Sequence, residues 1–222
     1  MKITNNVIKS YLKNVLFING TAYAGKSTMC KMLSDKYNLL HCEENYCMDK
    51  FLAVATPKLQ PNMSYFKINQ DWQKFLNRAP QEYEAWIDGN SREIAEFEIL
   101  ELIQLSKHKK VIVDTNIPMD ILKEITDYHQ VAILLSPQSM SVDYFFDRMD
   151  PEKLFLLDQI QKADNPKKTM DNFKACLAQV NSNVNYKKWL NSGFYTIIRE
   201  NTTNDTRLEV LSKLADHFKL ND

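Results

Sequence analysis

The chain has 222 residues, of which 44% are hydrophobic, and this is enough for one large domain with a sizeable core. Lysine and arginine together number 28, as do aspartate and glutamate, so no overall positive charge draws the protein toward nucleic acid or an anionic membrane. We therefore expect no nucleic-acid partner and no membrane partner, and any phosphate-binding site must be local.

Cysteine usage and the N-terminal residues indicate the compartment. The four cysteines form no C-x-x-C pair, and residues 1–14 lack the apolar core of a signal peptide. The longest apolar runs, such as VAILL, are far shorter than the roughly 20 residues that a membrane-spanning helix needs. We expect a reduced, cytoplasmic protein, and the sequence is compatible with a monomer or a homodimer.

Five short runs rich in valine, isoleucine and leucine are predicted to be β-strands. Near-continuous apolar sequence, without polar alternation, is typical of strands that are covered on both faces. The five runs are residues 14–19, 39–42, 110–114, 131–135 and 194–199.

Stretches with helical periodicity lie between and after these runs. They cover residues 25–37, 91–107, 119–129, a long region from 142 to 190, and 206–220. This alternation indicates an α/β fold with a parallel sheet and right-handed crossovers. Asn90 and Thr206, each followed three residues later by glutamate, are predicted N-caps, and Asp150 is a predicted N-cap before a proline at the first helical position.

Segment 51–90 fits this alternation least well. It contains two proline breaks and then an aromatic-rich stretch, and we interpret it as an insertion that caps the substrate side of the sheet. Its aromatic residues could line an acceptor pocket or stack on a base, although such residues more often form the core that holds an insertion in place. They are Tyr65, Phe66, Trp72, Phe75 and Trp86.

The sequence GTAYAGKS, residues 20–27, matches the phosphate-binding pattern G-x-x-x-x-G-K-[ST]. Only four glycines occur in the chain, far below the roughly 7% of ordinary usage, and two of them lie in this motif. A buried strand is predicted before the motif and a helix after it, which is the setting that the motif requires. The alternative, a turn that needs glycine only for geometry, does not explain Lys26, a cation in the first turn of a helix.

In this setting the backbone N–H groups wrap the phosphates, Lys26 reaches the terminal phosphates, and the Ser27 hydroxyl ligates Mg²⁺. We therefore predict a site for ATP and Mg²⁺. The predicted nucleotide-binding residues of the loop are Gly20, Thr21, Ala22, Tyr23, Ala24, Gly25, Lys26, Ser27 and Thr28.

With this loop and this order of elements, the chain resembles the P-loop kinase superfamily, which includes nucleoside monophosphate kinases and shikimate kinase. The resemblance covers the whole chain in element order, but only the loop is a specific motif. It implies the P-loop nucleoside triphosphate hydrolase fold: a five-stranded parallel sheet in the order 2-3-1-4-5 with helices on both faces. The fold would form a single domain of residues 1–222, which carries the insertion and a lid at residues 142–175. The chain departs from the family at Tyr23, where these kinases commonly have a further glycine.

Polar residues that follow the predicted strands are candidates for the metal and acceptor sites, because ligands bind at the carboxyl ends of parallel strands. Asp114 ends the strand expected beside the loop and could hold Mg²⁺ together with Ser27, and the alternative is a cap for the next turn. Glu43 and Glu44 follow the second strand, where shikimate kinase and its relatives place acids that contact the acceptor. Glu44 could orient the acceptor hydroxyl or accept its proton, with Asp49 a weaker candidate for this role. The alternative is a pair of solvated glutamates.

Two arginines are candidates for binding phosphate or carboxylate groups. Arg92 is expected in the first turn of a helix, where the dipole disfavours a cation, so an anionic group of the acceptor could lie beside it. The alternative for Arg92 is a salt bridge with Glu96. Arg148 lies between two predicted helices, and superfamily members carry arginines in a lid that closes over the transferred phosphoryl group. Lys153 shares this junction, and the alternative for Arg148 is an ordinary exposed helical arginine.

The segment after the fifth strand is the place where relatives of this superfamily position the adenine. Asn201, Thr202 and Thr203 could supply contacts there, and the alternative is a polar loop that ends in a helix cap. We predict Asn201 and Thr202 as adenine contacts.

Together, these features predict a kinase that transfers the γ-phosphoryl group of ATP to a small-molecule acceptor, with nucleotides and nucleosides among the candidate acceptors. Its predicted catalytic residues are Lys26, Asp114, Glu44 and Arg148. One alternative is a P-loop NTPase or nucleotide-binding regulatory module without an acceptor, whose aromatic insertion would then be a partner surface. Another is a kinase that acts on nucleic-acid ends, but the net charge of zero argues against a basic groove.

Overall fold

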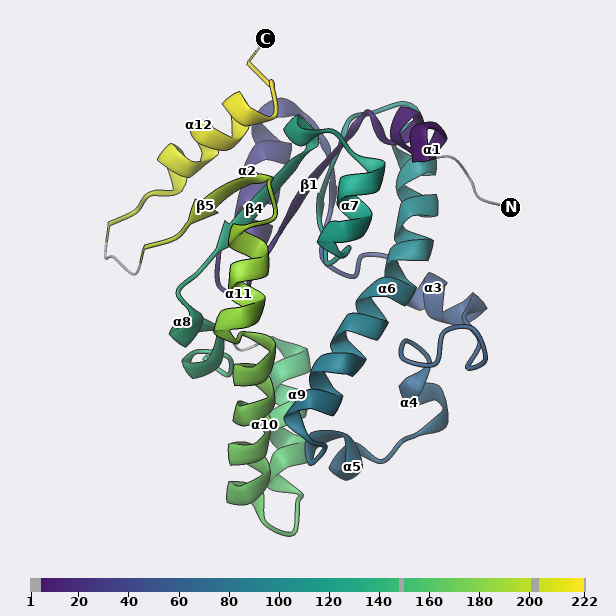
Figure 1. Cartoon of the computed structure of the whole chain (residues 1–222), viewed down its shortest axis with the longest axis vertical. Helices are drawn as coiled ribbons and strands as arrows, with labels where there is room; N and C mark the ends of the chain where they lie inside the picture. Colours follow the sequence, from purple (N-terminus) through teal and green to yellow (C-terminus); the bar gives the residue numbers. More distant parts are fainter. Residues whose placement is uncertain (1–4, 148–149, 201–203, 222) are drawn as a thin grey trace.

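The computed structural model describes residues 5–147, 150–200 and 204–221. At its centre is a five-stranded sheet in which all neighbouring strands are parallel (Figure 1). The strands are β1 (Val15–Gly20), β2 (Leu40–Cys42), β3 (Val111–Asp114), β4 (Val131–Leu135) and β5 (Tyr195–Ile198). The predicted α/β fold with a five-stranded parallel sheet is therefore confirmed. The order β2-β3-β1-β4-β5 agrees with the order that the family resemblance implies.

The three central strands are apolar because helices cover both faces of the sheet. Every residue of β1, β3 and β4 is buried. The register pairs Ile18 with Asp114 and Gly20 with Leu134, so the carboxyl ends of β3, β1 and β4 meet at one edge. This is the edge at which open parallel sheets bind their ligands.

Two groups of helices cover the sheet. On one face lie α2 (Lys26–Tyr37) and α12 (Arg207–His217). On the other face lie α1 (Asn5–Leu12), the C-terminal part of α6 (Pro80–Leu105), α7 (Met119–Ile125) and α11 (Asn183–Leu190). A 3₁₀ helix, Tyr128–Gln130, precedes β4, and α1 was not predicted from the sequence. Within the described ranges, no helix is long and apolar enough to cross a membrane.

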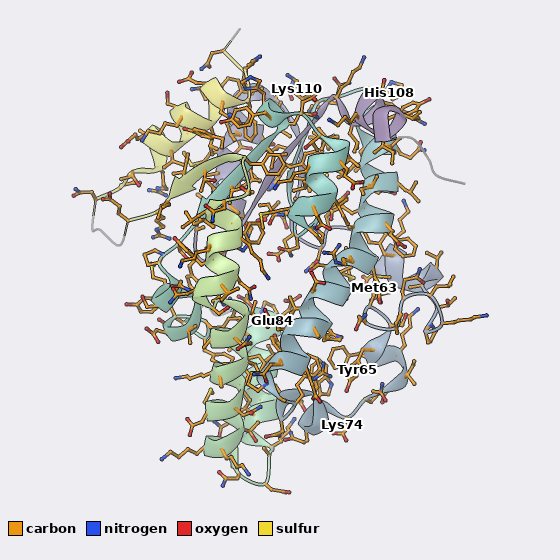
Figure 2. The ribbon with its side chains drawn as sticks, viewed as in Figure 1. Met63, Tyr65, Lys74, Glu84, His108 and Lys110 are labelled. Atoms are coloured by element: carbon orange, nitrogen blue, oxygen red, sulfur yellow. The ribbon has the colours of Figure 1, made fainter. Side chains whose placement is uncertain are left out.

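A further group of helices forms a lobe below the sheet in Figure 1, called the helical lobe from here on. It consists of α5 (Trp72–Leu76), the N-terminal part of α6, α9 (Pro151–Gln161) and α10 (Pro166–Val180). Its core residues are Phe75, Leu76, Tyr83, Ile160, Phe173, Cys176 and Leu177. Residues of the predicted insertion and of the predicted lid therefore pack on one another. In Figure 2, Tyr65 and Lys74 lie in this part of the molecule, whereas His108 and Lys110 lie at the opposite end.

The aromatic residues of the insertion pack against the core of the helical lobe. Phe66 stacks on Trp72 with ring centroids 4.0 Å apart, and Phe75 meets Trp86 edge to face at 4.8 Å. The structure thus favours the interpretation that these side chains hold the insertion in place. The remaining short helices are α3 (Met48–Val54), α4 (Tyr65–Ile68) and α8 (Gln138–Asp143).

The observed N-termini of the helices can be compared with the predicted N-cap residues. The N-cap at Asn90 is wrong, because α6 begins at Pro80 and continues through this position. Glu93 instead accepts hydrogen bonds from the backbone of Asn62 (3.2 Å) and Met63 (2.7 Å) in the insertion. Asp150 is confirmed as the N-cap of α9, since its side chain accepts from Lys153 N at 3.1 Å. Helix α12 begins directly after Thr206, but the Thr206 side chain makes no capping hydrogen bond.

Candidate phosphate-binding site

The loop between β1 and α2 begins at a position where only glycine fits. Asn19 fixes the start of the loop, because its side-chain oxygen accepts from Gly20 N (2.7 Å) and its amide donates to Ile117 O (2.7 Å). Gly20 has φ +135°, and a Cβ atom there would lie 1.8 Å from Leu134 O. The close approach of two backbone segments therefore requires glycine at this position.

Hydroxyl groups tie the next residues of the loop to the segment after β4. Thr21 N donates to Leu134 O at 3.0 Å, and Thr21 Oγ1 accepts from Ser136 N at 2.8 Å. Ala22 O accepts from Ser136 Oγ (2.7 Å) and from Ser141 Oγ (3.2 Å). These contacts hold the first half of the loop in one conformation. Sequence reasoning missed both serines, although a serine directly after β4 was an available signal.

The second half of the loop presents backbone N–H groups. Gly25 is the N-cap of α2, with φ +89° and no side-chain capping bond. Among the described residues, the N–H groups of Gly25, Lys26, Ser27 and Thr28 have no acceptor, whereas Met29 N donates to Gly25 O. A helix N-terminus carries roughly half a positive elementary charge. Together with its unpaired N–H groups, it can bind an anion such as phosphate.

Lys26, Ser27 and Asp114 meet at the start of α2. Ser27 Oγ donates to Asp114 Oδ2 at 2.7 Å, and Lys26 Nζ lies 3.7 Å from Asp114 Oδ1. The Lys26 side chain is 10% exposed and that of Asp114 is fully buried, so salt screens this ion pair only weakly. The carboxylate at the end of β3 therefore pairs with the loop rather than capping the turn that follows.

The residues around Asp114 suit a divalent cation with oxygen ligands. Burial raises the pKa of Asp114 above its usual range, and Lys26 and Ser27 oppose this rise. Asp114 Oδ1 is buried and accepts no hydrogen bond from any described residue, so this oxygen has unused acceptor capacity. Mg²⁺ is usually held by one or two carboxylates together with phosphate oxygens and water, and Ser27 and Asp114 fit such a site. Within the described part of the chain, no group of three or more His, Cys, Asp or Glu side chains is arranged to hold a metal.

Tyr23 has φ +63°, a left-handed conformation that favours glycine. Its neighbours hold it there. The Tyr23 hydroxyl donates to Tyr144 O, the Tyr23 carbonyl accepts from Arg199 at 2.7 Å, and Lys153 Nζ lies 5.5 Å from the centroid of the Tyr23 ring. The glycine that P-loop kinases commonly have at this position would adopt this conformation without strain. The contacts of Tyr23 also bring the start of α9 beside the loop.

A pocket of about 470 Å³ adjoins the start of α2. Ala24 and Thr28 line it on one side and Ile197 of β5 contributes an apolar side chain. The other lining residues include Arg199, Glu200, residues 204–207, Glu209 and Lys213. This volume falls within the range of roughly 300–1,000 Å³ that small-molecule sites occupy. The pocket lies beside the loop and after β5, where the resemblance predicts the adenine. Sequence reasoning did not name Arg199.

Several predicted residues cannot be placed at the site. Arg148, Asn201, Thr202 and Thr203 lie outside the described residues. Asp49 is exposed in the first turn of α3. The lid contact predicted for Arg148 and the adenine contacts predicted for Asn201 and Thr202 therefore stay predictions, as does the acceptor role suggested for Asp49.

Two glutamates lie near Asp114. Glu44 is exposed and accepts a hydrogen bond from Asn116 Nδ2 at 2.6 Å. Glu98, in the middle of α6, is only 6% exposed, and burial raises its pKa to about 8, with the Asp114 and Glu44 carboxylates adding to the rise. Sequence reasoning missed Glu98 because its position within a helix carries no signal of burial beside β3. Glu43 is exposed in the turn after β2.

Arg92 belongs to a surface ion-pair network. It lies in the middle of α6 rather than in a first turn, so the dipole argument for an anionic acceptor beside it is wrong. Its guanidinium bonds Asp120 at 2.9 and 3.3 Å and Asp88 at 3.0 Å. Arg92 does form surface salt bridges, but the predicted partner Glu96 is wrong, because the carboxylates that it bonds belong to Asp88 and Asp120. Arg92 thus links α6 to the start of α7.

Comparisons with known proteins do not assign the chain to a family. No family model matches it, and no curated protein is significantly similar to it. The function of the site therefore has to be inferred from its geometry and from the motif that forms it.

Proposed function

We propose that this protein is an ATP- and Mg²⁺-dependent phosphotransferase that transfers the γ-phosphoryl group to a small-molecule acceptor, with the P-loop nucleoside triphosphate hydrolase fold. The observation that carries the proposal is the cluster of Lys26, Ser27 and Asp114 at the N-terminus of α2. Unpaired N–H groups, a cation and a hydroxyl–carboxylate pair occur together there, which is the combination that a nucleotide with a divalent cation requires. The strand order and the position of the loop after β1 support the proposed fold.

In this proposal, the N–H groups of residues 25–28 and the Lys26 ammonium bind the phosphates. At 3.7 Å, Lys26 and Asp114 form an ion pair that is longer than a hydrogen bond, so the ammonium N–H groups are not bonded to this carboxylate and can donate to a phosphate. Ser27 and Asp114 hold Mg²⁺, which when bound neutralises charge on the β and γ phosphates.

The base of the nucleotide would occupy the pocket beside α2. Its wall at Ile197 is apolar, and Arg199 at its edge also donates to Tyr23 O in the loop. A ligand that fills this pocket therefore contacts a residue that supports the phosphate loop. This arrangement lets the base and the phosphates be bound by one continuous surface.

Glu44 is the best-placed carboxylate for the acceptor. Unlike Asp114 and Glu98, it is exposed, so a substrate hydroxyl can reach it, and its bond from Asn116 restricts its position. A carboxylate within hydrogen-bond reach of a hydroxyl can orient it and accept its proton during transfer. Positioning and charge neutralisation supply most of the rate enhancement in such reactions.

The test is ADP release from Mg·ATP, measured with and without panels of nucleotides, nucleosides, sugars and aminoglycosides. Release should rise with one acceptor class, and Lys26→Ala should lower it by roughly 10²-fold or more because a cation on the transferred phosphate is lost. Lys31→Ala is the matched control, because Lys31 lies on the same helix but is 70% exposed and pairs with Asp35.

Two outcomes would contradict the proposal. Full ADP release by Lys26→Ala would show that this lysine does not bind the transferred phosphate. Release that no acceptor increases, yet is lost in Lys26→Ala, would indicate an NTPase or a nucleotide-responsive regulatory module instead of a kinase.

A further inference from the structure

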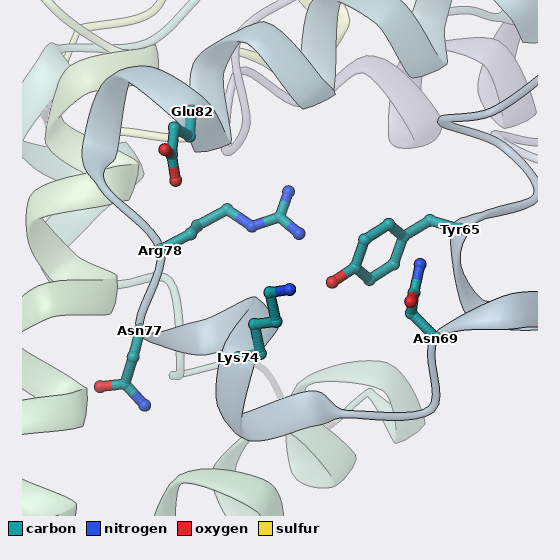
Figure 3. A pocket seen from close by; sticks show the side chains of 6 residues that line it. All are labelled: Tyr65, Asn69, Lys74, Asn77, Arg78 and Glu82. Carbon is teal, nitrogen blue, oxygen red and sulfur yellow. The ribbon is translucent and has the colours of Figure 1, made fainter.

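A polar hollow lies in the helical lobe, around α5 and the start of α6 (Figure 3). Its volume of about 470 Å³ is sufficient for a small molecule. Figure 1 shows α5 and the start of α6 at the end of the molecule away from the sheet, so the hollow is separate from the phosphate-binding loop. It is lined by Tyr65, Asn69, Lys74, Asn77, Arg78 and Glu82.

Arg78 is held in place by aromatic rings. Its guanidinium carbon lies 4.3 Å from the ring centroid of Phe75, 4.9 Å from that of Tyr65 and 5.7 Å from that of Trp86. Its backbone is fixed as well, because Arg78 O accepts from Asn172 Nδ2 at 3.0 Å. Aromatic stacking uses the face of a guanidinium and leaves its N–H edge available to an oxyanion.

Lys74 points into the same space. In Figure 3 the Lys74 ammonium, the Arg78 guanidinium and the Tyr65 hydroxyl are directed toward a shared centre. Neither cation forms a salt bridge with a carboxylate of the described residues, although Lys50 and Arg92 each do. Two cations that face one hollow repel each other, and a bound anion would relieve this repulsion.

Glu82 is the acidic residue of the lining. Its carboxylate accepts from Ala79 N at 3.4 Å and so caps the start of α6. With two cations and one carboxylate, the lining has a net charge of +1. Glu82 therefore reduces the attraction for an anion without cancelling it, and it can accept a hydrogen bond from a hydroxyl group of a ligand.

We propose that this hollow binds a small molecule that carries a phosphate monoester. A phosphate monoester has a charge of about −1.5 to −2 at neutral pH, which offsets the two positive charges of Lys74 and Arg78. The Arg78 edge matches two phosphate oxygens, and the Lys74 ammonium and Tyr65 hydroxyl can donate to the third. Asn69 and Glu82 can bind hydroxyl groups of the esterified molecule, whereas the Asn77 amide is already bonded to Gln73 O and Thr169 Oγ1. This site does not depend on the kinase proposed for the loop.

The experiment follows the indole N–H signals of the protein in ¹H–¹⁵N spectra during titration with inorganic phosphate and with glycerol 3-phosphate. Trp86 lies beside Arg78 and donates to Asn62 O at 3.1 Å, so its signal reports the hollow, whereas Trp189 packs against the sheet. We expect both phosphates to shift the Trp86 signal saturably, with glycerol 3-phosphate binding more tightly. Acetate at matched ionic strength should produce no saturable shift.

Variants separate this site from the loop. Arg78→Gln and Lys74→Gln should each weaken binding about tenfold or more, because each removes a charge-assisted hydrogen bond. Lys174→Gln, an exposed position on α10 of the same lobe, should leave it unchanged. Lys26→Ala should also leave the Trp86 titration unchanged, since the phosphate loop lies elsewhere.

Four results would overturn the proposal. The first is a Trp86 signal that does not saturate with either phosphate. The second is equal binding in wild type and in the Arg78 and Lys74 variants, with spectra that otherwise show a folded protein. The third is an equal response to acetate, and the fourth is loss of the titration in Lys26→Ala, which would assign the phosphate to the loop.

Discussion

Glycine-to-alanine substitution at three positions with positive φ tests how closely the loop approaches β4. Gly20 (φ +135°), Gly25 (φ +89°) and Gly193 (φ +81°) all occupy conformations that other residues rarely adopt. At Gly25 and Gly193 an added Cβ meets no atom within 4 Å, so alanine costs only the strain of a left-handed backbone. That strain is about 1–2 kcal/mol per residue.

At Gly20 the same substitution also creates a clash. The new Cβ would lie 1.8 Å from Leu134 O, which is 1.2 Å short of the 3.0 Å that real Cβ contacts respect. Relief requires β1 or β4 to shift, which breaks the 3.0 Å hydrogen bond from Thr21 N to Leu134 O. Backbone strain, overpacking and the lost bond together are expected to lower the free energy of unfolding by about 3–6 kcal/mol.

Urea unfolding followed by circular dichroism measures these differences. Gly20→Ala should lower the free energy of unfolding the most, and Gly25→Ala and Gly193→Ala should lower it by similar, smaller amounts. Gly25→Ala should in addition weaken ATP binding, because the methyl group is added among the N–H groups at the start of α2. Equal stability of Gly20→Ala and Gly193→Ala would refute the close approach of the loop to β4.

Other substitutions test single contacts. Because burial raises the pKa of Glu98 to about 8, the folded state binds one more proton than the unfolded state between about pH 4.5 and 8, so stability should fall as pH rises through this window. Glu98→Gln should flatten this fall in urea titrations at several pH values, and an unchanged slope would contradict the burial of a protonated Glu98. Asp150→Ala removes the cap on Lys153 N and should cost about 1 kcal/mol in thermal unfolding, whereas no loss would show that the cap is not formed. Arg92→Ala should cost at most about 1 kcal/mol, because its ion pairs are solvent-exposed, and should leave ADP release intact. A large loss of ADP release in an Arg92→Ala protein of unchanged stability would instead indicate that Arg92 binds substrate.

The sheet and the loop at residues 20–27 could be predicted from local sequence for physical reasons. Strands that are buried on both faces are mostly apolar, apart from residues at their carboxyl ends such as Asn19 and Asp114, so runs such as VAILL identify them within about a residue. The loop motif is local as well. Gly20 is required by the β4 backbone, and Lys26 lies in a first turn that otherwise disfavours cations.

Features that depend on distant contacts could not be predicted in this way. Asn90 and Glu93 have the spacing of a capping box, but Glu93 bonds the insertion about 30 residues earlier, and the helix continues past Asn90. Arg92 finds Asp120 on another helix. The packing of segment 51–90 on residues 151–180 joins parts of the chain whose sequences show no sign of being neighbours.

Calorimetric titration with ATP is the decisive measurement for the proposed triphosphate site. It compares wild type, Lys26→Ala, Asp114→Asn and the control Lys31→Ala, each with and without Mg²⁺. Wild type and the control should bind ATP more tightly with Mg²⁺, Asp114→Asn should lose this gain, and Lys26→Ala should bind weakly under both conditions. Equal ATP affinity of wild type and Lys26→Ala, or no ATP binding by wild type, would contradict a nucleotide site at this loop.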